Sequence, residues 1–245
     1  LNEINNNLQR IRELTVQAAN GTNSASDRQS IQNEINERLQ EINRVSAQTQ
    51  FNGVMVLAEN RTLTIQVGAN DNQTIGISLR RIDVTTLGLD GFNVGATTGP
   101  IEELRAVDAN GTTTITPVTF NIDGSSALNG QTLTLHGYGT YDEATGAYQH
   151  WAIRDEAGNM YKVDDTEISV DAATGEVSIS ANVDPSFLTT QKTAYETDVA
   201  NGIASTANPL AALDSALQHV DDLRSHLGAI QNRFESTIAN LNNTI

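Results

Sequence analysis

The chain has no cysteine, few basic residues, few aromatics and no long apolar run. The absence of cysteine excludes disulfides, thiolate chemistry and cysteine-ligated metal sites. Lysine and arginine total 14 against 30 acidic residues, and a net charge of -16 disfavours nucleic acid as a partner, because affinity for phosphates comes from cations. No run approaches the roughly 20 apolar residues of a membrane span and no basic-then-apolar leader opens the sequence, so we predict a soluble chain with no membrane partner.

The interior must be built mainly from aliphatic side chains. Aromatics make up 4% and hydrophobic residues 38% of the 245 residues, a composition that gives a thin core and favours an elongated shape. Residues 98–208 carry 4 basic and 16 acidic side chains, so most of the net charge lies there. The pattern also changes in this stretch, from helical periods to short runs separated by threonine and glycine. We therefore predict a helical core formed by residues 1–97 and 209–245, with 98–208 inserted as a separate domain.

The first 50 residues have the period of two amphipathic helices. From Leu1 to Ala18 the apolar residues recur at spacings of three and four, up to a stop at Asn20-Gly21. A second helix is predicted to begin near residues 24–26, because Ser26 and Gln29 have capping-box spacing. A turn at residues 52–53, which are Asn-Gly, is expected to follow it.

The last 37 residues have the same helical period. Pro209 suits a first helical position, and the leucine-rich pattern that follows predicts a helix about 50 Å long at about 1.5 Å per residue. Amphipathic helices cannot bury their stripes alone, so we predict a coiled-coil-like bundle of this helix with the two N-terminal ones. Neither outer helix has a cap at the chain end, and we expect both to be truncated parts of longer helices.

Period-two alternation predicts β-structure between the helices. Residues 62–67 and 74–79 alternate around a turn-rich segment, as in a β-hairpin that packs on the helices. In the insertion, six runs separated by turn residues predict a small, mostly antiparallel β domain, so the fold class is α+β. These runs are 112–122, 131–136, 148–154, 160–163, 167–170 and 176–180.

No constellation of residues predicts catalysis or a metal site. The histidines fall in two predicted domains, and the two on the last helix are seven residues apart, too far along its axis for one ion. Acidic pairs lie in predicted turns without the spacing of a calcium loop, and no nucleophile has a partner histidine. We therefore predict no enzymatic activity, no cofactor and no metal; a hydrolase would need a catalytic pair or metal that the sequence lacks. The histidines are His136, His150, His219 and His226.

The polar faces of the predicted helices are rich in Asn, Gln, Ser and Thr, and lysine occurs only at positions 162 and 192. Such faces can form lateral hydrogen bonds with other copies of the chain, although an ordinary solvated helix is the alternative. Residues 8–14 (LQRIREL) and 46–53 (SAQTQFNG) resemble the N-terminal helical core of bacterial flagellin. Residues 63–70 resemble its hairpin, and 208–210, 223–225, 227–229 and 231–234 resemble its returning C-terminal helix.

This resemblance implies a subunit of the flagellar filament, secreted by the flagellar type III route and serving motility. The helical core, called D1 in the family, packs against other flagellin subunits, while the insertion corresponds in position to the variable outer domain, D2. The terminal D0 segments are not matched, so the resemblance implies a fragment that is monomeric and does not polymerise alone.

The family is also a ligand of the host Toll-like receptor 5, and the resemblance places seven residues on the receptor-facing surface. Arginine beside exposed leucine is a good hot-spot composition, because the guanidinium is a planar fork of donors and leucine supplies apolar area. Core packing is the alternative for Leu213 and Leu217. The seven are Gln9, Arg10, Leu14, Glu34, Leu213, Leu217 and Arg233.

A secreted adhesin is a second hypothesis. In that case the β insertion would hold a ligand through its aromatic side chains, and function would be lost when 98–208 is deleted. The aromatics are Tyr138, Tyr141, Tyr148 and Trp151.

Overall fold

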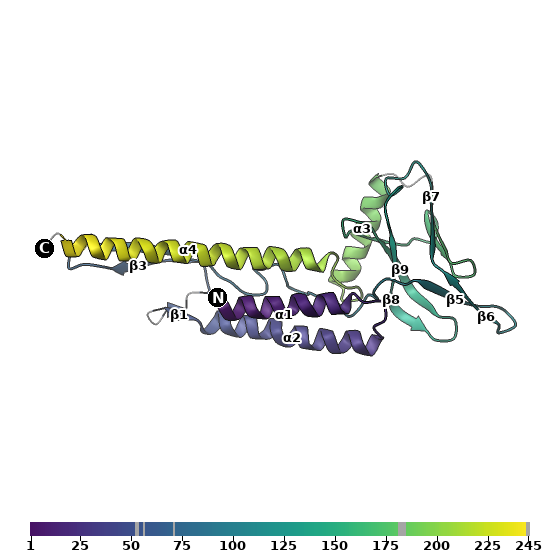
Figure 1. The fold of residues 1–245 in the computed structure, drawn as a ribbon, viewed down its shortest axis with the longest axis horizontal. Helices are drawn as coiled ribbons and strands as arrows, with labels where there is room; N and C mark the ends of the chain where they lie inside the picture. The colour runs from purple at the N-terminus through teal and green to yellow at the C-terminus, as the bar shows by residue number, and fades with distance from the viewer. Residues whose placement is uncertain (52–53, 56, 71, 181–184, 244–245) are drawn as a thin grey trace. The chain divides into compact units, whose positions relative to one another are not determined.

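A computed structural model describes residues 1–51, 54–55, 57–70, 72–180 and 185–243 (Figure 1). It is an α+β structure, as predicted, and the turn expected at residues 52–53 lies outside the described residues. The helices are α1 (Asn2–Ala18), α2 (Ala25–Gln48), α3 (Pro185–Ala200) and α4 (Pro209–Asn243). The strands are β1 (Gln50–Phe51), β2 (Val54–Met55), β3 (Arg61–Gln66), β4 (Thr74–Leu79), β5 (Glu103–Val107), β6 (Thr113–Pro117), β7 (Thr119–Ile122), β8 (Thr134–Asp142), β9 (Ala147–Arg154), β10 (Met160–Lys162), β11 (Ile168–Asp171) and β12 (Glu176–Ile179).

The chain divides into two compact units, and the division falls inside α1 and α2. The first unit comprises Leu1–Glu13, Ile35–Asp90 and Leu210–Ile245, and the second comprises Leu14–Glu34 and Gly91–Pro209. The second unit therefore contains the predicted insertion together with residues 14–34 and 91–97 and Pro209.

The first unit is built on the predicted amphipathic helices, which lie alongside one another in Figure 1. Polar pairs join them: Arg12 Nε donates to Asp214 Oδ1 at 2.9 Å between α1 and α4, and Arg38 donates to Asn7 at 3.4 Å between α2 and α1. Their apolar stripes are buried, as the threes-and-fours spacing predicts. The buried side chains include Ile4, Leu8 and Ile11 of α1, Ile35 and Ile42 of α2, and Leu213, Val220 and Leu223 of α4.

The predicted hairpin is confirmed and packs on α4. Strands β3 and β4 pair antiparallel with Leu63 opposite Ile77, and alternate residues of β4 are buried. Its apolar face forms a cluster with Ile230 of α4, against which Leu227 and Phe234 also pack.

Helix α2 begins with a capping box, but at a different pair of residues from the predicted one. The Asp27 N–H donates to Ser24 Oγ at 3.0 Å, and the Ser24 N–H donates to the Asp27 carboxylate at 2.9 Å. Two backbone donors at the helix start are thereby satisfied, with aspartate in the role usually taken by glutamate. The prediction of Ser26 and Gln29 is wrong, because Gln29 lies inside the helix and donates to Asn33.

The second unit contains the mostly antiparallel β structure that the sequence predicts. Its described sheets have the strand orders β10-β9-β8, β11-β12-β7 and β5-β6, and β12 pairs with β7 in parallel. The predicted strand 112–122 is two strands, since Pro117 has no N–H and Val118 donates instead to the carbonyl of Glu102.

Two elements of this unit were not predicted, β5 and α3. Helix α3 turns polar side chains inward as well as apolar ones: Gln191 is buried and donates to the Lys162 carbonyl at 2.7 Å, and Asp198 is buried too. The apolar stripe is correspondingly sparse, so periodicity gives no helical signal there.

Candidate interaction surfaces

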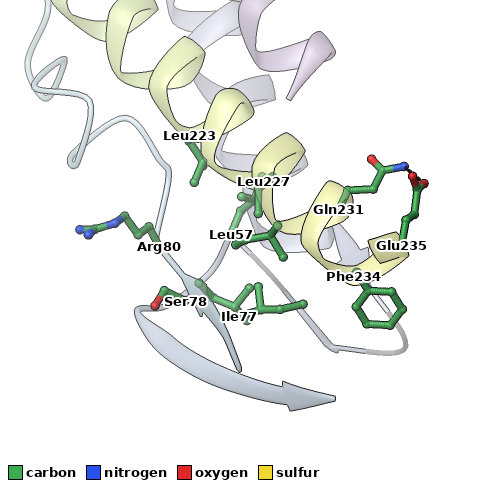
Figure 2. A pocket seen from close by; sticks show the side chains of 11 residues that line it. Leu57, Ile77, Ser78, Arg80, Leu223, Leu227, Gln231, Phe234 and Glu235 are labelled. Carbon is green, nitrogen blue, oxygen red and sulfur yellow. Dashed lines mark hydrogen bonds between the residues drawn. The ribbon is translucent and has the colours of Figure 1, made fainter. Parts of the chain in front are cut away.

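The first unit has an apolar groove between α4 and the β3–β4 hairpin. Its volume is about 510 Å³, and Figure 2 shows Leu57, Ile77, Leu223 and Leu227 turned towards the hollow. Gln231 and Glu235 lie on the side of α4 away from Arg80 in that view, with Phe234 at the edge of the groove. The lining residues are Leu57, Ile77, Ser78, Leu79, Arg80, Leu223, Leu227, Ile230, Gln231, Phe234 and Glu235.

The apolar stripe of α4 continues along the groove but is only partly covered. Leu223 and Ile230 are buried, whereas Leu227, Phe234 and Leu241 are half-buried and Ile238 is 37% exposed. Large apolar side chains at helical spacing are normally buried against a neighbouring element. The groove therefore has the composition of a surface that docks an apolar partner.

The predicted receptor residues on α1 differ in accessibility. Gln9 is exposed, and the Arg10 side chain is 41% exposed and forms an ion pair with Glu13 at 3.1 Å. Both lie on one turn of the helix. The Arg12–Asp214 pair holds the start of α4 beside this part of α1.

Two of the predicted contact residues are inside the protein. Leu14 is 2% and Leu213 is 0% exposed, so core packing describes Leu213, and neither leucine offers apolar area to a partner in this structure. Leu217 and Glu34 are half-buried, while Arg233 is exposed. Leu213 and Arg233 are 20 residues apart on α4, about 30 Å along its axis at about 1.5 Å per residue, so they do not share one patch.

The aromatic residues of the insertion do not form one exposed platform. Tyr138 is completely buried, and its hydroxyl donates to Asp198 Oδ2 at 2.7 Å. Tyr141 is 47% exposed, and its ring lies 4.8 Å from Tyr148, which in turn lies 5.5 Å from Trp151. These ring contacts stabilise the β8–β9 hairpin. Because Tyr138 is buried, it cannot contact a ligand as the adhesin hypothesis requires.

A buried polar network surrounds Tyr138. Asp198 also pairs with Lys162 Nζ at 2.8 Å, and Tyr195 donates to the Ser205 carbonyl at 2.7 Å. Burial alone would raise the pKa of Asp198, but the Lys162 and Tyr138 hydrogen bonds outweigh it and hold the pKa below its usual range. The network satisfies its members internally, as buried polar groups require.

Among the described residues there is neither a cluster of metal-ligating side chains nor a helix with the length and apolarity of a membrane span. His136 is buried, with Nδ1 2.8 Å from the Thr98 carbonyl and Nε2 2.7 Å from Thr134 Oγ1. Within the described chain, no group of three or more His, Cys, Asp or Glu side chains is placed to hold a metal, and no helix is long and apolar enough to cross a membrane.

Comparison with known proteins identifies the family. A sequence profile of the bacterial flagellin N-terminal helical region matches residues 1–62, and one of the bacterial flagellin C-terminal helical region matches 210–245. Flagellin of Salmonella rubislaw is 35% identical over an alignment that covers 100% of this chain and 73% of the relative. The chain belongs to the bacterial flagellin family. This confirms the resemblance drawn from the helical motifs.

Other flagellins are similar over shorter alignments. Flagellin of Salmonella typhimurium is 49% identical over 181 residues, covering 74% of this chain and 36% of the relative. This flagellin chain thus spans about a third of the length of that relative. A solved structure of FliC from Burkholderia pseudomallei is 24% identical, covers 95% of both chains and has a TM-score of 0.39. Flagellin is a structural, non-enzymatic protein, so family membership bears out the prediction that the chain is not an enzyme.

Proposed function

We propose that this chain is part of a subunit of the extracellular flagellar filament and that its first unit, which contains α4 and the β3–β4 hairpin, makes contacts with other flagellin subunits. The observation that carries the proposal is the apolar groove between α4 and the β3–β4 hairpin. Partly covered aliphatic side chains on regular elements gain free energy when another subunit removes them from water, at roughly 25 cal/mol per Å² of apolar area. Membership of the flagellin family supplies the assembly in which such burial occurs.

Exchange into a complete flagellin tests the proposal. The region of a motile strain's flagellin that matches this chain is replaced by this sequence, and filaments are counted by electron microscopy. We expect filaments and swimming. A stable, exported chimera that never assembles would contradict the proposal.

The same chimera separates the filament subunit from the adhesin. Deletion of residues 98–208 with the flanks joined is expected to preserve filaments, because the assembly surface lies on the helices and the hairpin. An adhesin would instead keep its ligand binding in the insertion and lose it on deletion. A deletion variant that binds no other subunit although its helices remain folded would favour the insertion as the site of function.

We also propose that the helical surface is recognised by host Toll-like receptor 5, with Gln9 and Arg10 as its centre. Both stand on the solvent side of α1, and the partly exposed guanidinium offers donors to a partner. Leu217 and Arg233 of the same unit remain candidate contacts because each is at least partly exposed, whereas Glu34 is half-buried and belongs to the second unit. Leu14 and Leu213 act, in this proposal, by supporting the helices from inside.

Two separate arginines on the helices, Arg10 and Arg44, provide a matched test of receptor recognition. Arg10→Ala is expected to weaken binding to the receptor ectodomain by about 1 to 3 kcal/mol, the range of an interface hot spot. Arg44→Ala is the control, because Arg44 also forms an exposed ion pair three residues away in sequence, with Glu41. Equal losses in the two variants, or none in either, measured by surface plasmon resonance, would remove Arg10 from the site.

A further inference from the structure

Four Asn-Gly pairs lie in the described part of the chain, and their surroundings differ. They are at residues 20–21, 110–111, 129–130 and 201–202, and all eight residues are exposed. In an Asn-Gly pair the glycine nitrogen can attack the asparagine carboxamide, because glycine has no side chain to obstruct the approach. The attack needs a free side chain and a glycine N–H that is not held by another acceptor.

Only the pair at 129–130 meets both conditions among the described pairs. In the others, Gly111 donates to the Asp108 carbonyl at 3.0 Å, Gly202 donates to the Val199 carbonyl at 3.0 Å, and the Asn20 carboxamide oxygen accepts two hydrogen bonds from Thr22. Within the described residues, neither the Asn129 side chain nor the Gly130 N–H has a hydrogen-bond partner.

The turn around Gly130 is also open. Gly130 has a φ of +84°, and no atom lies within 4 Å of the position where a side chain would begin. The preceding and following backbone is held, since Asn129 donates to Ser126 and Gln131 donates to Leu128. The reactive nitrogen is therefore presented to water on a turn whose flanks are fixed.

We infer that Asn129 is a site of spontaneous deamidation, the fastest of the described Asn-Gly pairs. The Gly130 nitrogen bonds to Cγ of Asn129, the bond from Cγ to Nδ2 breaks, and ammonia leaves with the proton from Gly130, which closes a succinimide. Water then opens the ring at either carbonyl and leaves aspartate or isoaspartate at position 129. Each event adds one negative charge to the loop between β7 and β8, and the isoaspartyl product also lengthens the backbone there.

The rate order follows from the hydrogen bonds. The N–H of Gly111 or Gly202 must first break one backbone hydrogen bond. The net free energy of that hydrogen bond corresponds to a deamidation rate about five-fold lower than at Gly130. The Asn20 carboxamide must break two hydrogen bonds before it can turn, so deamidation at Asn20 is expected to be slower still.

Peptide mapping of the purified chain tests this inference. The protein is incubated at mildly alkaline pH in heavy-oxygen water, so that only deamidation during the incubation carries the label, and each site is followed by mass spectrometry. We expect labelled product at position 129 first, about five-fold faster than at 110 or 201. Comparable rates at 110, 129 and 201, or a faster reaction at any other described pair, would overturn the inference.

Two controls separate structure from sequence. In denaturant all four pairs are expected to react at similar rates, because the hydrogen bonds that distinguish them are gone; a ranking that survives unfolding would contradict the structural cause. Asn129→Gln is expected to remove the early charge variant seen by ion-exchange chromatography, while Asn110→Gln leaves it in place. Loss of that variant in Asn110→Gln instead would assign the reaction to the other turn.

Discussion

His136 is a buried group whose protonation is coupled to folding. Burial lowers its pKa from 6.5 to about 4, against the opposing effect of its hydrogen bond to the Thr98 carbonyl. The imidazole thus stays neutral between strand β8 and the segment that contains Thr98. Between about pH 6.5 and 4, His136 binds a proton more readily in the unfolded chain than in the folded one. Its contribution to the free energy of unfolding is therefore complete above this window and falls as the pH drops through it.

His136→Gln is expected to remove this pH dependence from the second unit. The parent should lose up to about 3 kcal/mol of unfolding free energy between about pH 6.5 and 4, and the variant should lose measurably less. Urea titrations followed by the fluorescence of Trp151, the single tryptophan, report on this unit. An identical loss in parent and variant would show that His136 is not the group responsible.

At the scale of elements, the Ser24–Asp27 capping box starts α2. Ser24→Ala removes the acceptor for the Asp27 N–H and is expected to cost about 1 kcal/mol of stability. Ser26→Ala is the matched control, because Ser26 lies inside the helix and makes no cap. Thermal unfolding followed by circular dichroism should show a lower midpoint for the first variant only; equal midpoints would place the cap elsewhere.

Amphipathic periodicity predicted α1, α2, α4 and the hairpin because their burial is regular. Ile4, Leu8 and Ile11 repeat at helical spacing, and β4 buries every second residue. The same reasoning missed α3, whose buried side includes Gln191 and Asp198, since those side chains find partners only through the tertiary fold. The period also places Leu14 in the apolar stripe of α1, so its burial was predictable, and only the resemblance put it on a receptor surface. The groove was beyond sequence reasoning, because it depends on which elements lie opposite.

At the scale of the whole chain, the surface of the first unit and that of residues 98–208 differ in polarity and charge. The first unit presents an apolar groove and has no lysine, whereas residues 98–208 contain both lysines of the chain and still carry most of the net negative charge. A strongly acidic surface is well hydrated and disfavours close packing of like copies. The charge distribution therefore supports assembly through the helices and exposure of the insertion to the medium.

The central claim is that the groove on α4 carries the contacts between subunits. Its most direct test is to place a charge in the groove of the flagellin chimera and image filaments. Phe234→Glu puts a carboxylate among Ile77, Leu227 and Ile230, while Ser236→Glu adds the same charge at an exposed position of the same helix. We predict that Phe234→Glu abolishes filaments and Ser236→Glu retains them, with equal helicity in both. Normal filaments from a folded Phe234→Glu chimera would contradict the claim.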